Sequence, residues 1–72
     1  MKGRITKIKT EDQSVEPYAF IRLDTRKDLF APAENFHRSF EMARVGMKVK
    51  VHGTEPPRRK GRCEVATGVT FV

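Results

Sequence analysis

The chain has 72 residues, and its 15 lysines and arginines against 9 acidic residues give a formal net charge of +6. A domain of this size buries little more than half of the surface of its unfolded chain, which predicts a single domain over residues 1–72, a stability on the order of a few kcal/mol and no deep catalytic pocket. The only cysteine, Cys63, excludes an intrachain disulfide, and the charged N-terminus and short apolar runs argue against a signal peptide or membrane span, so we expect a cytoplasmic protein without membrane partners.

The first predicted strand covers residues 3–9, where apolar and polar residues alternate imperfectly. Ile5 and Ile8 lie three positions apart, and a regular strand cannot place two such side chains on one face. A bulge between them would bring both side chains to the inner face. The polar residues 10–17 then form a connection to the next strand.

Residues 18–23 and 28–31 predict a hairpin, because only the short polar turn 24–27 separates these two strand-like runs. Pro32 is expected to end the second strand, since proline has no backbone N–H to donate to a ladder. The two strands would therefore lie side by side and antiparallel.

The aromatic residues of this hairpin fall on the face opposite to its aliphatic residues. Successive strand side chains point to opposite faces, so burial of one set turns the other set outward. The aliphatic set is Ala19, Ile21, Leu23, Leu29 and Ala31, and the outward set is Tyr18, Phe20, Arg22 and Phe30. In a strongly basic chain, outward rings with an arginine predict a stacking platform for unpaired bases.

Residues 33–45 break the alternation. Phe36 and Phe40 lie at helical spacing there and predict one or two short helical turns within a long connection. Residues 47–52 alternate again and predict a fourth strand with its valines inward.

The C-terminal part begins with a basic loop, residues 55–62, which starts with prolines and closes with glycine. The last strand covers residues 63–72, with a bulge or bend near Gly68. Five short strands favour an all-β fold, a small closed barrel, because closure removes exposed strand edges. Its predicted inward residues are Ile5, Ile8, Ile21, Leu29, Val49 and Val51.

Several segments resemble the cold-shock domain family. Residues 1–5, MKGRI, are similar to the first strand of that family, which begins Lys-Gly-Lys/Arg-Val. Residues 16–21, EPYAFI, line up with its first nucleic-acid motif, Lys-Gly-Phe-Gly-Phe-Ile, and residues 29–33, LFAPA, with its second, Val-Phe-Val-His-Phe. Phe40 and Gly46 fit a later family phenylalanine and the glycine that opens the fourth strand.

The resemblance implies a five-stranded OB-fold barrel that binds single-stranded RNA and DNA. It also implies that the ring at Phe40 can contact bases, and that the protein is an RNA chaperone or a transcriptional or post-transcriptional regulator. The expected mechanism is binding without catalysis.

The departures from the family pattern bear on mechanism. Lys7 stands where the family usually has a surface tryptophan, and Pro32 and Ala33 stand where the second motif has histidine and phenylalanine. Glu16 and Pro17 replace the lysine and glycine of the first motif. Base–aromatic stacking contributes roughly 1–3 kcal/mol per base, so binding is expected to depend more on phosphate contacts by cations.

The predicted site has no catalytic residue, cofactor or metal. His37 and His52 lack a second ligand at metal spacing, and Cys63 lacks an activating base. The predicted nucleic-acid-binding residues are Lys7, Tyr18, Phe20, Arg22, Phe30, Phe40, Arg58, Arg59, Lys60 and Arg62.

Other interpretations stay open. Exposed aromatic patches also mark protein-binding surfaces, so the alternative is a small OB-fold interaction module that docks an acidic partner in a transcription or translation complex. An S1-like module resembling bacterial translation initiation factor 1 is a third option. Phe36 and Phe40 also fit a role as core or loop anchors. A weak or strand-exchanged homodimer is a further alternative.

Overall fold

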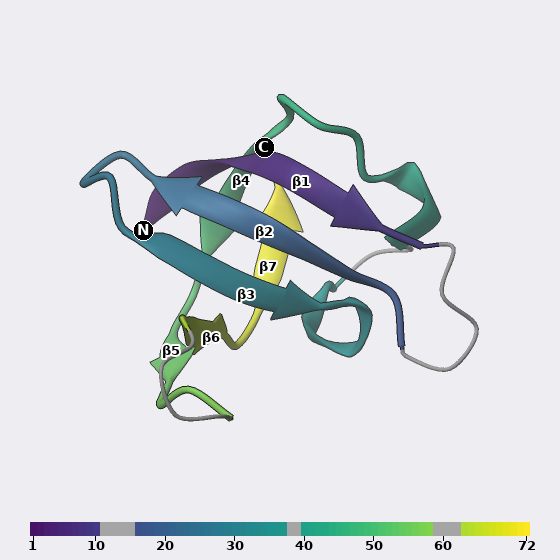
Figure 1. Cartoon of the computed structure of the whole chain (residues 1–72). Coiled ribbons are helices and arrows are strands. Elements are labelled where there is room, and N and C mark those ends of the chain that lie inside the picture. The colour runs from purple at the N-terminus through teal and green to yellow at the C-terminus, as the bar shows by residue number, and fades with distance from the viewer. Residues whose placement is uncertain (11–15, 38–39, 59–62) are drawn as a thin grey trace.

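The computed structural model describes residues 1–10, 16–37, 40–58 and 63–72 (Figure 1). The strands are β1 (Lys2–Lys9), β2 (Tyr18–Leu23), β3 (Asp28–Pro32), β4 (Lys48–Val51), β5 (Thr54–Glu55), β6 (Glu64–Ala66) and β7 (Val69–Phe71). Two 3-10 turns, η1 (Ala33–Asn35) and η2 (Phe40–Met42), lie between β3 and β4, where helical turns are predicted. The all-β class is confirmed, but the described residues form seven strands rather than five.

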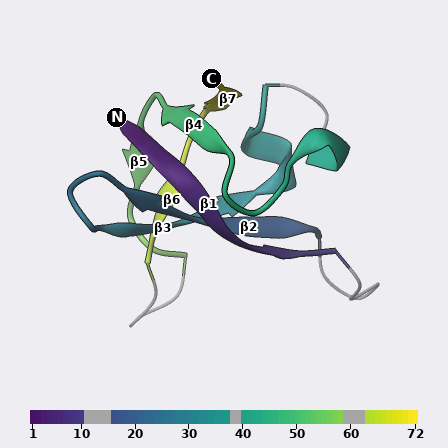
Figure 2. The ribbon, with the colours of Figure 1, turned by 90° about the horizontal axis from the view of Figure 1, so that it is seen from above.

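The strands form one curled mixed sheet in the order β5-β6-β3-β2-β1-β4-β7. All neighbours are antiparallel except β3 and β6, which are parallel. The sheet curls into a half-barrel, and the view from above in Figure 2 shows β4 and β7 on one side of β1 with β2 and β3 on the other.

The predicted bulge in β1 is confirmed. Ile5 pairs with Ile21, and the next paired residue is Lys7, so Thr6 is the additional residue. The Thr6 hydroxyl donates a hydrogen bond of 3.3 Å to the carbonyl of Phe20. This shift returns the second half of β1 to the alternation that its partner strand requires.

The predicted hairpin of β2 and β3 is also confirmed. Leu23 closes the turn by donating its N–H to the carbonyl of Lys27 at 2.8 Å, and Arg26 takes the left-handed conformation with φ of 70°. Pro32 is the last residue of β3 and pairs with Tyr18. The strand therefore ends one residue later than predicted.

The core lies inside the curl and is built from aliphatic side chains. Of the six predicted inward residues, Ile8 is half-buried against the core, and the other five are at most 1% exposed: Ile5, Ile21, Leu29, Val49 and Val51. The C-terminal strands add Val65, Ala66 and Val69, which are equally buried. Phe36 is 8% exposed and completes the core from the β3–β4 connection.

One additional strand arises because the predicted last strand is interrupted, and the other, β5, lies outside the predicted strands. The last strand is divided into β6 and β7 by Thr67 and Gly68, where Gly68 has a φ of +119° that side-chain-bearing residues rarely adopt. This bend lets β6 pair with β3 and β7 pair with β4. The predicted fourth strand, residues 47–52, is observed as β4, and β5 lies beyond its predicted end, partly in the stretch predicted as the basic loop.

Candidate nucleic-acid interface

Three rings gather on the outer face of β2 and β3, and we call them the aromatic triad. The ring centroids lie 5.7 Å apart for Tyr18 and Phe20, 5.2 Å for Tyr18 and Phe30, and 6.0 Å for Phe20 and Phe30. All three side chains are half-buried, whereas Ala19 and Ile21, which alternate with them on β2, are fully buried. The rings thus lie on the face opposite to the core, as the alternation predicts.

The rings of the aromatic triad meet at steep angles. The ring planes are 87° apart for Tyr18 and Phe20, 66° for Phe20 and Phe30, and 40° for Tyr18 and Phe30. Two of these contacts are edge-to-face, a favourable geometry for aromatic pairs, and the contact of Tyr18 with Phe30 is tilted. Contacts between rings favour particular ring orientations, which would lower the entropy cost of stacking a flat ligand on the triad.

Two lysines of β1 flank the aromatic triad. Lys7 pairs with Phe20, and Lys9 pairs with Tyr18, across the β1–β2 ladder. Both lysines are exposed, and within the described residues neither forms an ion pair. Cross-strand neighbours on one face have Cβ atoms about 4.5–5.5 Å apart, so these ammonium groups can reach a phosphate next to a base stacked on the triad.

Arg58 approaches the aromatic triad from the opposite side. Its guanidinium carbon lies 6.0 Å from the centroid of the Phe30 ring, a cation–π distance. The same guanidinium donates a hydrogen bond of 2.8 Å to Oε1 of Glu34. Arg58 is therefore held beside the triad, as predicted, but it shares its charge with a carboxylate. The other predicted loop cations, Arg59, Lys60 and Arg62, lie outside the described residues.

Arg22 has an acidic partner that the sequence-based prediction of the site missed. Its Nε donates to Oδ1 of Asp28 at 2.9 Å, and a second nitrogen lies 3.4 Å from Oδ2. This hydrogen bond holds the pKa of Asp28 below its usual value and raises the pKa of Arg22. The hairpin register pairs Arg22 with Asp28, so counting outward from the predicted turn could have found the partner. The pair leaves Arg22 less available to phosphates than predicted.

A second exposed ion pair borders the same hairpin. Nζ of Lys27 lies 2.8 Å from Oε1 of Glu64, and this contact lowers the pKa of Glu64. Asp28, Glu34 and Glu64 thus each pair with a cation on the hairpin or close to it.

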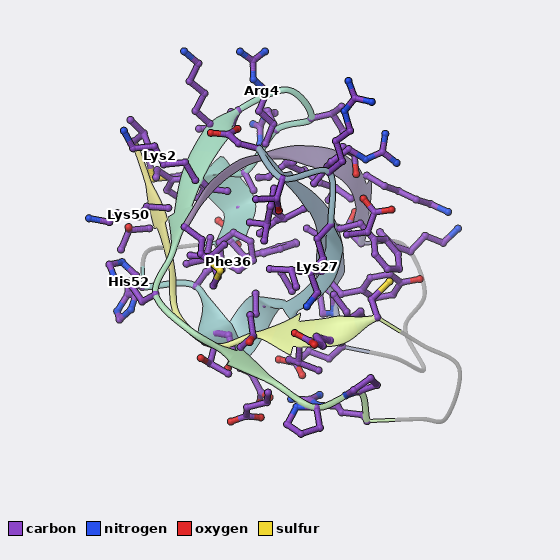
Figure 3. All side chains as sticks on the ribbon, turned by 90° about the vertical axis from the view of Figure 1, so that its left-hand side faces the viewer. Lys2, Arg4, Lys27, Phe36, Lys50 and His52 are labelled. Carbon is purple, nitrogen blue, oxygen red and sulfur yellow. The ribbon has the colours of Figure 1, made fainter. Side chains whose placement is uncertain are left out.

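Phe40 does not join the aromatic triad. Its ring centroid lies 4.9 Å from that of Phe36 at an angle of 84°, and Phe36 in turn lies 5.8 Å from Phe71. Phe40 is half-buried and packs against the core, and Figure 3 shows Phe36 inside the curl of the sheet. The geometry of Phe40 matches the alternative role of a loop anchor.

The remaining candidate groups are polar or sulfur-containing side chains near the surface. His37 and His52 are exposed, as expected, with ring centroids 5.6 Å apart, and Nε2 of His52 lies 3.0 Å from Oγ1 of Thr70. Cys63 is a free, half-buried thiol. Among the described residues, His, Cys, Asp and Glu side chains do not gather in groups of three or more that could hold a metal ion.

Across the described ranges, no helix combines the length and apolarity needed to cross a bilayer. In comparisons with known proteins, neither a family model nor a curated protein matches the chain. What can be inferred about its function therefore follows from its own residues and their arrangement.

Proposed function

We propose that this protein is a cold-shock-like OB-fold domain that binds single-stranded RNA or DNA with little sequence preference. The observation that carries the proposal is the aromatic triad on the outer face of β2 and β3, with Lys7 and Lys9 beside it. Unpaired bases of any type offer a flat apolar face to such rings, and lysines neutralise the adjoining phosphates.

The strand pairing supports the barrel part of this proposal. An OB-fold is a five-stranded Greek-key barrel that binds on the face of strands two and three. The seven strands correspond to five if β4 with β5 and β6 with β7 are each counted as one bent strand. The last bent strand then pairs with β3 at one end and β4 at the other, as barrel closure requires.

In the proposed mechanism, stacking and phosphate contacts are divided between rings and cations. Tyr18, Phe20 and Phe30 stack on splayed bases, while Lys7 and Lys9 track the backbone. Arg58 adds a cation at the far side of the Phe30 ring. The predicted loop cations Arg59, Lys60 and Arg62 would continue this path.

A strand held in this way cannot pair with its complement. A ligand that binds only one state shifts the population towards that state, so the protein would disfavour RNA hairpins by mass action. This activity needs no chemical step and fits an RNA chaperone or a regulator of transcription or translation.

A second candidate function is docking of a protein partner. The ion pairs of Arg22 with Asp28 and of Arg58 with Glu34 place carboxylates at the rim of the aromatic triad. Carboxylates repel phosphates, whereas a hydrophobic centre with a mixed polar rim is common in protein interfaces. The two functions differ in whether an isolated oligonucleotide binds.

An amide-shift titration with a seven-nucleotide oligothymidine or oligouridine tests the proposal. We expect the largest shifts in the second half of β1 and in β2 and β3, where the triad and its lysines lie. Absence of shifts with either oligonucleotide, or shifts centred on the Phe36 and Phe40 cluster, would contradict it.

A further inference from the structure

A second basic surface lies on β1 and β4, away from the aromatic triad. Lys2 pairs directly with Lys50, and Arg4 pairs directly with Lys48, across the antiparallel β1–β4 ladder. All four side chains are exposed, and Figure 3 shows the labelled members Lys2, Arg4 and Lys50 projecting outward from the sheet. We call these four residues the β1–β4 patch.

The charges of the β1–β4 patch are poorly compensated. Within the described ranges, none of the four cations forms an ion pair, although Asp24 lines a shallow hollow together with Lys2, Arg4 and Lys48. Like charges directly opposite each other on antiparallel strands are destabilising. The fold therefore carries an electrostatic cost at this surface.

Protection of a sheet edge does not explain the patch. Lysines often line edge strands, where they prevent pairing with another chain. Here β1 lies between β2 and β4, and β4 lies between β1 and β7, so neither is an edge strand. Gly3 and Val49 point inward, so the four residues next to them on β1 and β4 must point outward. Any polar residue could occupy those outward positions, so alternation alone does not explain why all four are cations.

The patch is continuous with the surface that carries the aromatic triad. Arg4 pairs with Arg22, which lies two residues from Phe20 on β2. Lys7 and Lys9 belong to the same strand as Lys2 and Arg4. Lys9 lies seven positions after Lys2, so their Cα atoms are about 23 Å apart along β1.

We propose that the β1–β4 patch binds the phosphates of a single strand beyond the bases stacked on the aromatic triad. The patch would thereby extend the binding site from β2 and β3 across β1 to β4. This inference depends on the proposed function. OB folds cover roughly 4–16 nucleotides, so a strand of about four would occupy only the triad and a strand of about twelve would reach both surfaces.

The test compares oligothymidines of four and twelve nucleotides on two variants that each lose two charges. Lys48→Gln with Lys50→Gln removes half of the β1–β4 patch, and Lys7→Gln with Lys9→Gln removes the lysines beside the triad. Affinity is measured by amide-shift titration for the short strand and by fluorescence anisotropy for the long strand. A longer strand can bind to the triad in more positions along its length, which raises its apparent affinity. Each variant is therefore compared with the parent at the same strand length.

For the parent, we expect amide shifts in β4 with the twelve-nucleotide strand and not with the four-nucleotide strand. The Lys48 and Lys50 variant should bind the long strand roughly tenfold more weakly, with the salt slope of its affinity reduced by about 1.4, and should bind the short strand as the parent does. The Lys7 and Lys9 variant should bind both strands more weakly.

Three outcomes overturn the inference. The Lys48 and Lys50 variant can bind the long strand as well as the parent does, which shows that the patch makes no contact. Both variants can weaken both lengths equally, which indicates a general effect of net charge. If the parent binds neither strand, the proposed function fails as well, whereas the first two outcomes leave binding at the triad intact.

Discussion

Phe20 and Phe30 lie directly opposite each other across the β2–β3 ladder with ring centroids 6.0 Å apart, and the next pair along, Ile21 and Leu29, is fully buried. A ring of the aromatic triad and a core residue thus occupy adjacent positions on each of the two strands. Because the two sets are interleaved on one hairpin, binding and folding can be perturbed at neighbouring positions.

Truncating the platform rings should weaken binding more than it weakens folding. Phe20→Ala and Phe30→Ala each remove a surface for one base, worth roughly 1–3 kcal/mol of binding free energy. Both rings are half-buried, so the loss in unfolding free energy should stay below the about 3–5 kcal/mol typical of a buried phenylalanine. Anisotropy titrations with an oligopyrimidine and denaturant melts of the same variants measure the two effects.

Ile21→Ala is the matched core control, since this residue is fully buried and directly follows Phe20 on β2. It should cost about 2–5 kcal/mol of stability. Unfolding of the phenylalanine variants alongside a tolerated Ile21→Ala would show that the rings form the core. Folded phenylalanine variants with parental affinity would favour the protein-docking function.

Removing the acidic partner of Arg22 should strengthen binding. Asp28→Asn frees a guanidinium two residues from Phe20, so the affinity for single strands should rise and its salt slope should steepen by about 0.7 if one further phosphate is contacted. Glu55→Gln, an exposed position on β5, makes the same change in net charge and serves as the control. An equal gain in both variants would mean that Arg22 has no specific role.

The exposed ion pairs predict a weak dependence of stability on acidity. Arg22 lowers the pKa of Asp28 from 3.8, and Lys27 lowers that of Glu64 from 4.5. A depressed carboxylate pKa contributes stability that is fully present above the unfolded value and is lost as the pH falls through the folded value. Asp28→Asn and Glu64→Gln should therefore lower the Tm slightly at neutral pH and leave it unchanged near about pH 2. A difference in Tm that persists in acid would assign the effect to packing.

Alternation along single strands predicted much of this structure. The three-residue spacing of Ile5 and Ile8 predicted the bulge at Thr6, and the hairpin pattern predicted which face Phe20 and Phe30 occupy. These features depend on neighbours close in sequence, where period and turn length fix the geometry.

Features set by distant segments were not predicted. The pairing of Lys2 with Lys50 joins residues 48 positions apart, and nothing in either strand alone selects this register. Phe40 was assigned to the binding site from a resemblance, but its contacts with Phe36 and Phe71 depend on how the β3–β4 connection folds back. Similarly, β6 and β7 exist as separate strands because each meets a different partner.

Gly3 should tolerate no side chain. A Cβ at this position would lie 2.6 Å from the carbonyl oxygen of Arg22, which is backbone that cannot move away without disturbing the β1–β2 ladder. Gly3→Ala should therefore cost about 1–3 kcal/mol in a denaturant melt. Lys2→Ala, the exposed neighbour on the same strand, should cost little, and equal losses in the two variants would show that strand propensity rather than the close approach is responsible.

Reversing one charge in the β1–β4 patch should raise the stability of the fold while it weakens binding of a long strand. Lys50 lies directly opposite Lys2, so Lys50→Glu replaces a repulsive cross-strand pair with an attractive one and should raise the unfolding free energy by about 0.2–1 kcal/mol. Lys50→Gln removes only the repulsion and should give a smaller gain. If the patch contacts phosphates, the ranking of the variants by affinity for a twelve-nucleotide strand is the reverse of their ranking by stability. Lys50→Glu should then bind most weakly, because a carboxylate faces the nucleic-acid backbone. Denaturant melts and anisotropy titrations at low salt measure both orders, and a stabilised Lys50→Glu variant that binds long strands as well as the parent would leave the basic surface without a role in binding.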